Sequence, residues 1–255
     1  MELNYKSFGQ GDPLIILHGM FGTLDNWQTI AKQLAEDYTV FIVDQRNHGR
    51  SPHAPEMDYP MMAEDLHDFM ESNWIYKAHL LGHSMGGKTV MQFALTYPQM
   101  VDKLVVVDIA PKTYVGGHQV IFEALLSVDL EQLATRKEAE AQLGNYIDDF
   151  GVRQFLLKNL TRKKEGGFEW KMNLAAIWAH YQDILKMVTG PEVFAGPSLF
   201  IRGGKSNYIA TEDMPEIKAS FTAAQLATVE DAGHWVHAEA PAILLEKLQT
   251  FLAAD

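Results

Sequence analysis

The sequence predicts a protein of the α/β class, with a mostly parallel sheet that helices cover on both faces. Short, continuously apolar runs rich in β-branched residues alternate with longer stretches in which apolar residues recur at helical spacing. The chain has 255 residues, a length that suits one large domain with an inserted segment. Strands are predicted over residues 13–19, 39–44, 78–83, 103–111, 197–204 and 224–234.

Helices are predicted between most of these strands. In residues 26–38, for example, Trp27, Ile30 and Leu34 fall on one helical face. Strands that alternate with helices imply right-handed crossovers between parallel neighbours in one sheet. Residues 3–8 predict an additional antiparallel strand at the edge of that sheet. The other core helices are expected over residues 59–72, 86–98 and 241–253.

One long segment breaks the alternation. Residues 112–196 show no good strand and are typical of helices rich in Phe, Leu, Met and Trp. Because a single connection between two strands normally holds one helix, we expect a helical cap over residues 112–196, inserted into a core made of residues 1–111 and 197–255. The alternative is a few more helices packed on the sheet. The cap helices are expected within residues 118–128, 131–147, 151–160 and 170–188.

The composition excludes several classes of function. The net charge is −12 and no block of Lys and Arg is present, which argues against binding to nucleic acid or to anionic lipid. The chain has no cysteine, and therefore no disulfide, thiolate metal site or cysteine nucleophile. The N-terminal sequence does not resemble a signal peptide and no apolar run is long enough to span a bilayer. We therefore expect a soluble, cytoplasmic protein; the oligomeric state is not indicated.

The stretch LLGHSMGG, residues 80–87, places a serine between glycines where a predicted strand meets a predicted helix. Gly82, Ser84 and Gly86 fit the pattern G-x-S-x-G, which in this context forms a tight turn with an exposed serine hydroxyl. The serine also precedes a helix N-terminus, which favours negative charge. The sequence therefore predicts Ser84 as a nucleophile.

A histidine base is expected late in the chain, because the usual order for this turn is Ser, then acid, then His. We predict His234, which follows Gly233 at the end of the last strand. His237 is a competitor three residues further on, and His83 is expected to be a supporting residue. A metal site at His234 and His237 is disfavoured because no third ligand cluster accompanies the pair.

An oxyanion site requires two main-chain N–H donors near the serine. Met85, directly after the nucleophile, is expected to supply one. The loop that follows LIILHG is expected to supply the other, with Met20 as first choice and Phe21 as second. The alternative is that HGMFG forms an ordinary turn.

The sequence resembles the serine esterases of the α/β-hydrolase fold, in particular bacterial short-chain esterases related to the mitochondrial abhydrolase-domain proteins. The resemblance implies a mostly parallel sheet flanked by helices, an inserted helical cap, no cofactor or metal, and hydrolysis of ester or thioester bonds. In DQRNHGRS we interpret Asp44, Arg46 and His48 as a structural turn held by buried polar pairs. The segments that carry the resemblance are LHGMFGTLDNW (17–27), VDQRNHGRSP (43–52), LGHSMGGKTVM (81–91), VVDIAPKTY (106–114), FLLKNL (155–160), IRGGKSNYI (201–209) and DAGHWVHAEAP (231–241).

The sequence departs from that family at the position of the acid. Most members carry an aspartate after the strand that corresponds to PSLFIRG, but here Ser206 stands there. We predict Asp108 as the acid, because a carboxylate directly after three valines needs a partner such as a histidine. Ser206 is expected to support Asp108. Glu212 and Asp213 are the alternative carboxylates.

The predicted function is hydrolysis of small-molecule carboxylic esters or acyl thioesters through an acyl-enzyme, on short to medium acyl chains. Phe21 and Trp178 are expected to contact the substrate, Trp178 as one of several aromatic residues that roof the site from the cap. Epoxide hydrolases and haloalkane dehalogenases are disfavoured because they use an aspartate nucleophile. A C–C bond hydrolase, a lactonase or a non-catalytic small-molecule receptor on the same fold are the alternatives.

Overall fold

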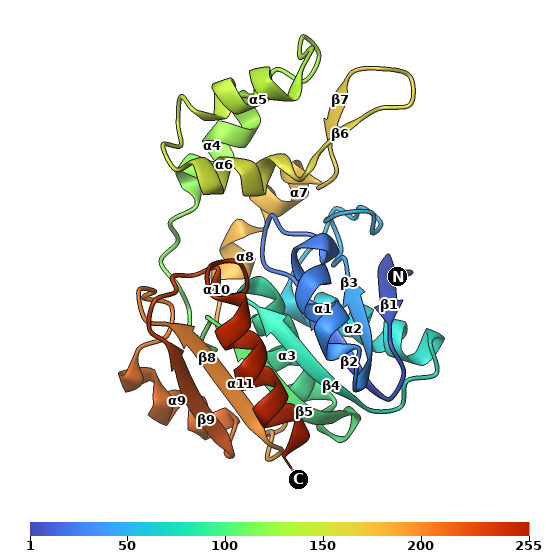
Figure 1. The fold of residues 1–255 in the computed structure, drawn as a ribbon, viewed down its shortest axis with the longest axis vertical. Coiled ribbons are helices and arrows are strands. Elements are labelled where there is room, and N and C mark those ends of the chain that lie inside the picture. Colours follow the sequence, from blue (N-terminus) through green and yellow to red (C-terminus); the bar gives the residue numbers. More distant parts are fainter. Residues whose placement is uncertain (255) are drawn as a thin grey trace.

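A seven-stranded sheet forms the centre of the computed structural model, which describes residues 1–254 (Figure 1). All neighbouring strands are parallel except β1, which pairs antiparallel with β3 at one edge, as the sequence predicts. In spatial order the strands are β1 (Tyr5–Phe8), β3 (Tyr38–Val43), β2 (Asp12–Leu17), β4 (Ala78–His83), β5 (Val101–Val107), β8 (Ser198–Gly203) and β9 (Ala224–Val229).

Helices bury both faces of the sheet because its strands are apolar on both sides. Along β2, Leu14 and Ile16 pack on one face, whereas Ile15 and Leu17 pack on the other. The first face is covered by α1 (Gln28–Leu34) and α11 (Pro241–Ala253), and the second by α2 (Tyr59–Ser72), α3 (Met85–Thr96) and α9 (Met214–Ser220). Short 3-10 helices lie at Leu24–Trp27, Pro98–Met100 and Thr211–Asp213, and α10 (Val236–Glu239) precedes α11.

Residues 112–196, called the cap segment below, connect β5 to β8 and stand over one end of the sheet (Figure 1). Their helices are shorter than the sequence indicates, since Asn173 caps a separate helix and His180 divides the last predicted one in two. The helices are α4 (Gln119–Ser127), α5 (Arg136–Leu143), α6 (Phe150–Leu157), α7 (Leu174–Ala179) and α8 (Tyr181–Leu185).

The expectation that the cap segment contains no strand was wrong. Strands β6 (Leu160–Arg162) and β7 (Phe168–Trp170) form an antiparallel hairpin. Its turn contains Gly166 and Gly167, both at positive φ, which glycine adopts without a steric penalty. Strands of three residues are too short for their alternation to be recognised in the sequence.

Two predicted strands end earlier than expected, and both ends bear on the site. β5 stops at Val107 because Asp108 has a φ of 53°, which ends the extended conformation. β9 stops at Val229, and the chain turns through residues 230–233 before His234. Within residues 1–254, no helix has both the length and the apolar character that crossing a bilayer requires.

Candidate active site

Ser84 lies on a strained turn between β4 and α3. Its φ of 53° and ψ of −118° are unusual for a residue with a side chain. The turn is closed by glycines that no other residue can replace without movement: a Cβ on Gly82 would lie 2.2 Å from the Gly86 oxygen, and one on Gly86 would lie 2.5 Å from the Leu17 oxygen. The close packing of strand, turn and helix thus requires the glycines of the motif.

His234 joins Ser84 to Asp108 by hydrogen bonds. His234 Nδ1 lies 2.7 Å from Asp108 Oδ2, and His234 Nε2 lies 3.0 Å from Ser84 Oγ. Because the carboxylate can only accept, Nδ1 carries the hydrogen and Nε2 is left to accept from the serine hydroxyl. The structure therefore brings together the three residues that the sequence singles out, from the ends of three different strands.

The Asp108 carboxylate is fully buried, and donors surround it. Oδ1 accepts the Gly203 N–H at 2.9 Å, and Oδ2 accepts the Ser206 hydroxyl in addition to His234. A buried carboxylate needs such donors to remain ionised. Ser206 therefore lies where the sequence predicts it, against Asp108.

The alternative carboxylates lie elsewhere. Asp213 pairs with Lys112, with 2.6 Å between Oδ2 and Nζ, and also accepts the Ala210 N–H. Glu212 is exposed on the same short helix. Asp108 is therefore the carboxylate that reaches His234.

The other two candidate histidines are buried and do not contact the serine hydroxyl. His83 Nε2 donates to the main-chain oxygen of His234 at 2.9 Å, which holds the loop of the proposed base. His237 stacks on Trp27 with 4.7 Å between ring centroids, and burial lowers its pKa to about 3. Within residues 1–254, no three His, Asp or Glu side chains are grouped so that they could hold a metal ion.

Met20 and Met85 both lie beside Ser84. The N–H of Met85 is at the first position of α3, where no helical acceptor exists, and that of Met20 has no acceptor among residues 1–254. The Phe21 N–H instead donates to His48 Nε2 at 3.3 Å. Of the two loop donors considered, Met20 is the one whose N–H is free.

The backbone of Phe21 is held from both sides. His48 Nδ1 donates to the Arg46 oxygen, so its Nε2 is the acceptor for the Phe21 N–H, and burial lowers the pKa of His48 to about 3, which keeps it neutral. On the other side, Asn159 Nδ2 of the cap segment donates to the Phe21 oxygen at 2.7 Å. These bonds hold Phe21 at a φ of 60°, directly after Met20.

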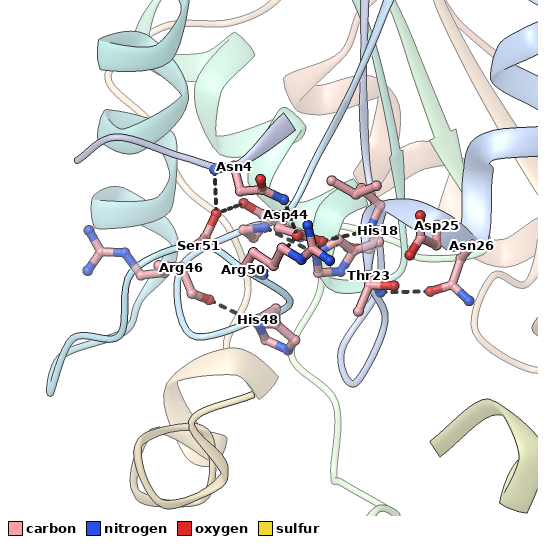
Figure 2. Close-up of polar contacts among 12 residues, drawn as sticks. Asn4, His18, Thr23, Asp25, Asn26, Asp44, Arg46, His48, Arg50 and Ser51 are labelled. Carbon is pink, nitrogen blue, oxygen red and sulfur yellow. Dashed lines mark hydrogen bonds and ion pairs between the residues drawn. The ribbon is translucent and has the colours of Figure 1, made fainter. Parts of the chain in front are cut away.

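The turn at residues 44–51 is held by hydrogen bonds around Asp44 (Figure 2). Asp44 Oδ1 accepts the Leu24 N–H at 2.7 Å, while Oδ2 accepts Asn4 Nδ2 and the Arg50 N–H. Ser51 Oγ donates to the Asp44 main-chain oxygen. The polar cluster thus joins the N-terminus, this turn and the loop after β2, as expected for a structural turn.

Two cavities meet at Ser84, and Met20 borders both. The first, of about 250 Å³, is lined among others by His234, Phe21, Phe155 and Trp235. The second, of about 340 Å³, is lined among others by Met85, Lys88, Tyr59, Tyr114 and Leu185.

The structure does not place Trp178 at the cavities where it was expected to contact the substrate. Trp178 lines neither cavity and is 41% exposed on the outer side of the cap segment. Its ring packs against Phe122 and stacks on Tyr181, with centroid distances of 4.7 and 6.2 Å. Sequence spacing alone does not indicate which aromatic residues of the cap segment border the cavities. Phe21, in contrast, does line the first cavity.

Sequence reasoning missed several residues of the site. The Tyr208 ring stacks on His234 at 4.0 Å between centroids, and His118 lies near its hydroxyl. Lys88 and Asn159 were inside recognised motifs but were assigned no role. The signal available in the sequence was Lys88 itself, the one charged residue in the predicted helix that follows Ser84.

Comparison with known proteins identifies the family. The family model of the α/β-hydrolase fold matches residues 12–241. The chain belongs to the α/β-hydrolase family. It is 45% identical to a solved structure titled marine microorganism esterase, with a TM-score of 0.96 and coverage of 98% of this chain and 99% of that one.

Two curated relatives show a similar level of identity. The sn-1-specific diacylglycerol lipase ABHD11 of Danio rerio is 40% identical, with 99% of this chain and 83% of the relative covered. Esterase YbfF of Escherichia coli is also 40% identical, with 94% and 92% covered. These relatives are named as hydrolytic enzymes. This chain is therefore an enzyme of the α/β-hydrolase family.

We predict that Asn159→Ala lowers kcat for ester hydrolysis by about five- to tenfold, the scale of one hydrogen bond, with little change in KM. The reason is that the Phe21 peptide loses its contact with the cap segment, and the neighbouring Met20 N–H loses its position. Steady-state kinetics measures both constants. Asn173→Ala is the matched control, because Asn173 joins the cap segment to Asn47 and not to this loop. Equal kcat values for the parent and Asn159→Ala would contradict the assignment.

We also predict that His237→Phe weakens the acid sensitivity of folding. The native pKa of His237 is about 3, below the unfolded value of about 6.5, so the unfolded chain binds more protons between these pH values. Stability is therefore lost as the pH falls from about 6.5 towards 3, by about 1.4 kcal/mol per pH unit for this group. Urea unfolding at pH 5 and 7.5 should show a drop about 2 kcal/mol smaller in the variant. An equal drop in the free energy of unfolding in the parent and in His237→Phe would contradict this prediction.

Proposed function

We propose that this enzyme hydrolyses carboxylic esters or acyl thioesters through an acyl-enzyme, with Ser84 as nucleophile, His234 as base and Asp108 as acid. The observation that carries the proposal is the continuous hydrogen-bonded series from Ser84 Oγ through the His234 ring to Asp108 Oδ2. Relatives named as esterases and lipases support the same class of substrate.

The geometry supports the following steps. His234 Nε2 takes the Ser84 proton as the serine oxygen attacks the acyl carbonyl, and Asp108 stabilises the imidazolium through Nδ1–H. His234 then gives the proton to the leaving alkoxide or thiolate. Water, deprotonated by the same nitrogen, attacks the acyl-enzyme and releases the acid.

The negative charge on the carbonyl oxygen would be stabilised by the N–H groups of Met20 and Met85. Both border the cavity at Ser84, and neither needs to break a protein hydrogen bond in order to donate. The N-terminus of α3 adds its dipole at the same point. Preorganised main-chain donors of this kind require no reorganisation during the reaction.

The acid and its supporting serine occupy two neighbouring strand ends. Asp108 follows β5, and Ser206 follows β8, where most members of the fold carry the aspartate. Because β5 and β8 are paired, the two positions are adjacent, and we expect a carboxylate at either one to reach His234. We propose that Asp108 supplies the charge and that the Ser206 hydroxyl keeps it ionised.

The two cavities support small substrates. Ser84 borders cavities of about 250 Å³ and about 340 Å³, and volumes of this size favour short to medium acyl chains. His234 lines the first cavity and not the second. Because His234 protonates the leaving group, we assign the leaving group to the first cavity and the acyl group to the second.

Ser84→Ala is expected to lower kcat on an activated short-chain aryl ester by about 10⁵-fold, as removal of a triad serine does elsewhere. A fluorophosphonate should attach one phosphonyl group to the peptide that contains Ser84 and to no other peptide. Peptide mass spectrometry measures this mass increase. Labelling of a different serine, together with retained activity in Ser84→Ala, would exclude this residue as the nucleophile. A folded protein that is neither labelled nor active would instead indicate a receptor.

Asp108→Asn is expected to lower kcat by about 10³- to 10⁴-fold, because the amide favours the wrong tautomer of His234. Ser206→Ala should cost about tenfold, the scale of one hydrogen bond. In the double variant Asp108→Asn/Ser206→Asp, part of the lost rate should return, since a carboxylate is restored at the neighbouring strand end. Near-parental activity of Asp108→Asn would show that the acid has been misassigned.

A further inference from the structure

Lys88 is a buried lysine one helical turn after the nucleophile. It lies on α3, where its N–H donates to the Ser84 oxygen at 3.1 Å, and its side chain is only 1% exposed. Among residues 1–254, no carboxylate lies within ion-pairing distance of its Nζ, although most buried ammonium groups are paired. The positive charge near the proposed nucleophile therefore has no carboxylate counter-ion among these residues.

The surroundings of the Lys88 ammonium belong to the wall of the second cavity. Nζ donates to the main-chain oxygens of Leu185 at 3.2 Å and of Lys186 at 2.5 Å, and lies 4.8 Å from the Tyr114 ring and 5.5 Å from the Tyr59 ring. Leu185, Tyr114 and Tyr59 all line that cavity, as do Lys88 and Ser84 themselves. Two of the three ammonium hydrogens are thus bonded to neutral carbonyls, and the third is not bonded to an oxygen of residues 1–254.

Burial without a counter-ion is costly for the charged form, and it lowers the pKa of Lys88 to about 7. A residue that only had to fill this space, such as methionine, would avoid that cost. A lysine at this position is useful if an anion enters the cavity and completes the pair. The acyl group is the part of the substrate that we assign to this cavity.

We propose that the second cavity is a subsite for acyl groups that carry a carboxylate, and that Lys88 pairs with this carboxylate. The preferred substrates are then half-esters or half-thioesters of short dicarboxylic acids. This inference rests on the proposed function, because it requires the acyl-enzyme at Ser84. The reaction remains a hydrolysis: water and the half-ester give the dicarboxylate and the alcohol.

The test compares acyl groups of one shape and different charge. Monoethyl glutarate carries the carboxylate, its terminal amide analogue is neutral and nearly isosteric, and ethyl pentanoate lacks the polar group. At pH 6.5, below the Lys88 pKa of about 7, kcat/KM of the parent enzyme should be about 10- to 100-fold higher for monoethyl glutarate than for the amide analogue. Comparing kcat/KM for monoethyl succinate, glutarate and adipate shows which distance between ester and carboxylate the enzyme prefers.

Lys88→Met should reduce that ratio to about one by losing activity on the anionic ester only. Lys186→Met is the matched control: the Lys186 side chain is 68% exposed, the change removes the same charge from the segment that Lys88 contacts, and it should preserve the ratio. Thermal unfolding of each variant verifies folding. If Lys88→Met does not fold, glutarate should still slow the fluorophosphonate labelling of Ser84 in the parent enzyme, whereas glutaramide should not.

The outcomes separate the two proposals. If Ser84 is labelled and neutral esters are hydrolysed, but the half-ester is not preferred or Lys88→Met retains the preference, the subsite proposal is overturned and the esterase proposal stands. If Ser84 is neither labelled nor needed for activity, the proposed function itself fails. If Lys88→Met is less stable but its ratio of kcat/KM values for the half-ester and the amide analogue is unchanged, Lys88 serves only to hold the cap segment in place.

Discussion

The burial of one carboxylate, Asp108, is the constraint on which the rest of the site depends. A fully buried negative charge is tolerated only when donors surround it. The donors come from two separate stretches of chain: the end of β8 provides the Gly203 N–H and the Ser206 hydroxyl, and the loop after β9 provides His234. Satisfying this charge therefore holds the loops after β8 and β9 against the end of β5, and directs Nε2 of the His234 ring to Ser84.

A second constraint acts on the loop after β2 and connects the cap segment to the core. The Phe21 peptide is bonded to the turn at residues 44–51 through His48 and to the cap segment through Asn159. Any displacement of the cap segment relative to the core would therefore move Phe21 and its neighbour Met20. This link explains why the turn at residues 44–51, which does not contact Ser84, still contributes to the geometry around it.

The order of the elements and the identity of the nucleophile could be predicted because each depends on local chemistry. Apolar runs ending in Gly, Asp or His indicated the six parallel strands, and glycines on both sides of Ser84 indicated the sharp turn. The interior of the cap segment could not be predicted as well. Its strands β6 and β7 have only three residues each, and its helices are short, so that caps and turns outweigh periodicity.

The sequence by itself determined the α/β architecture, the strained turn at Ser84, and the set of candidates from which Asp108, His234 and Ser206 emerged, because these follow from residue type and short-range spacing. Only the tertiary structure decided which of them meet. His237 and His234 are three residues apart, yet one stacks on Trp27 and the other reaches Ser84. Likewise, only packing shows that Trp178 faces outward while Lys88 borders the cavity. The physical reason is that side-chain direction depends on contacts between segments that lie far apart in the chain.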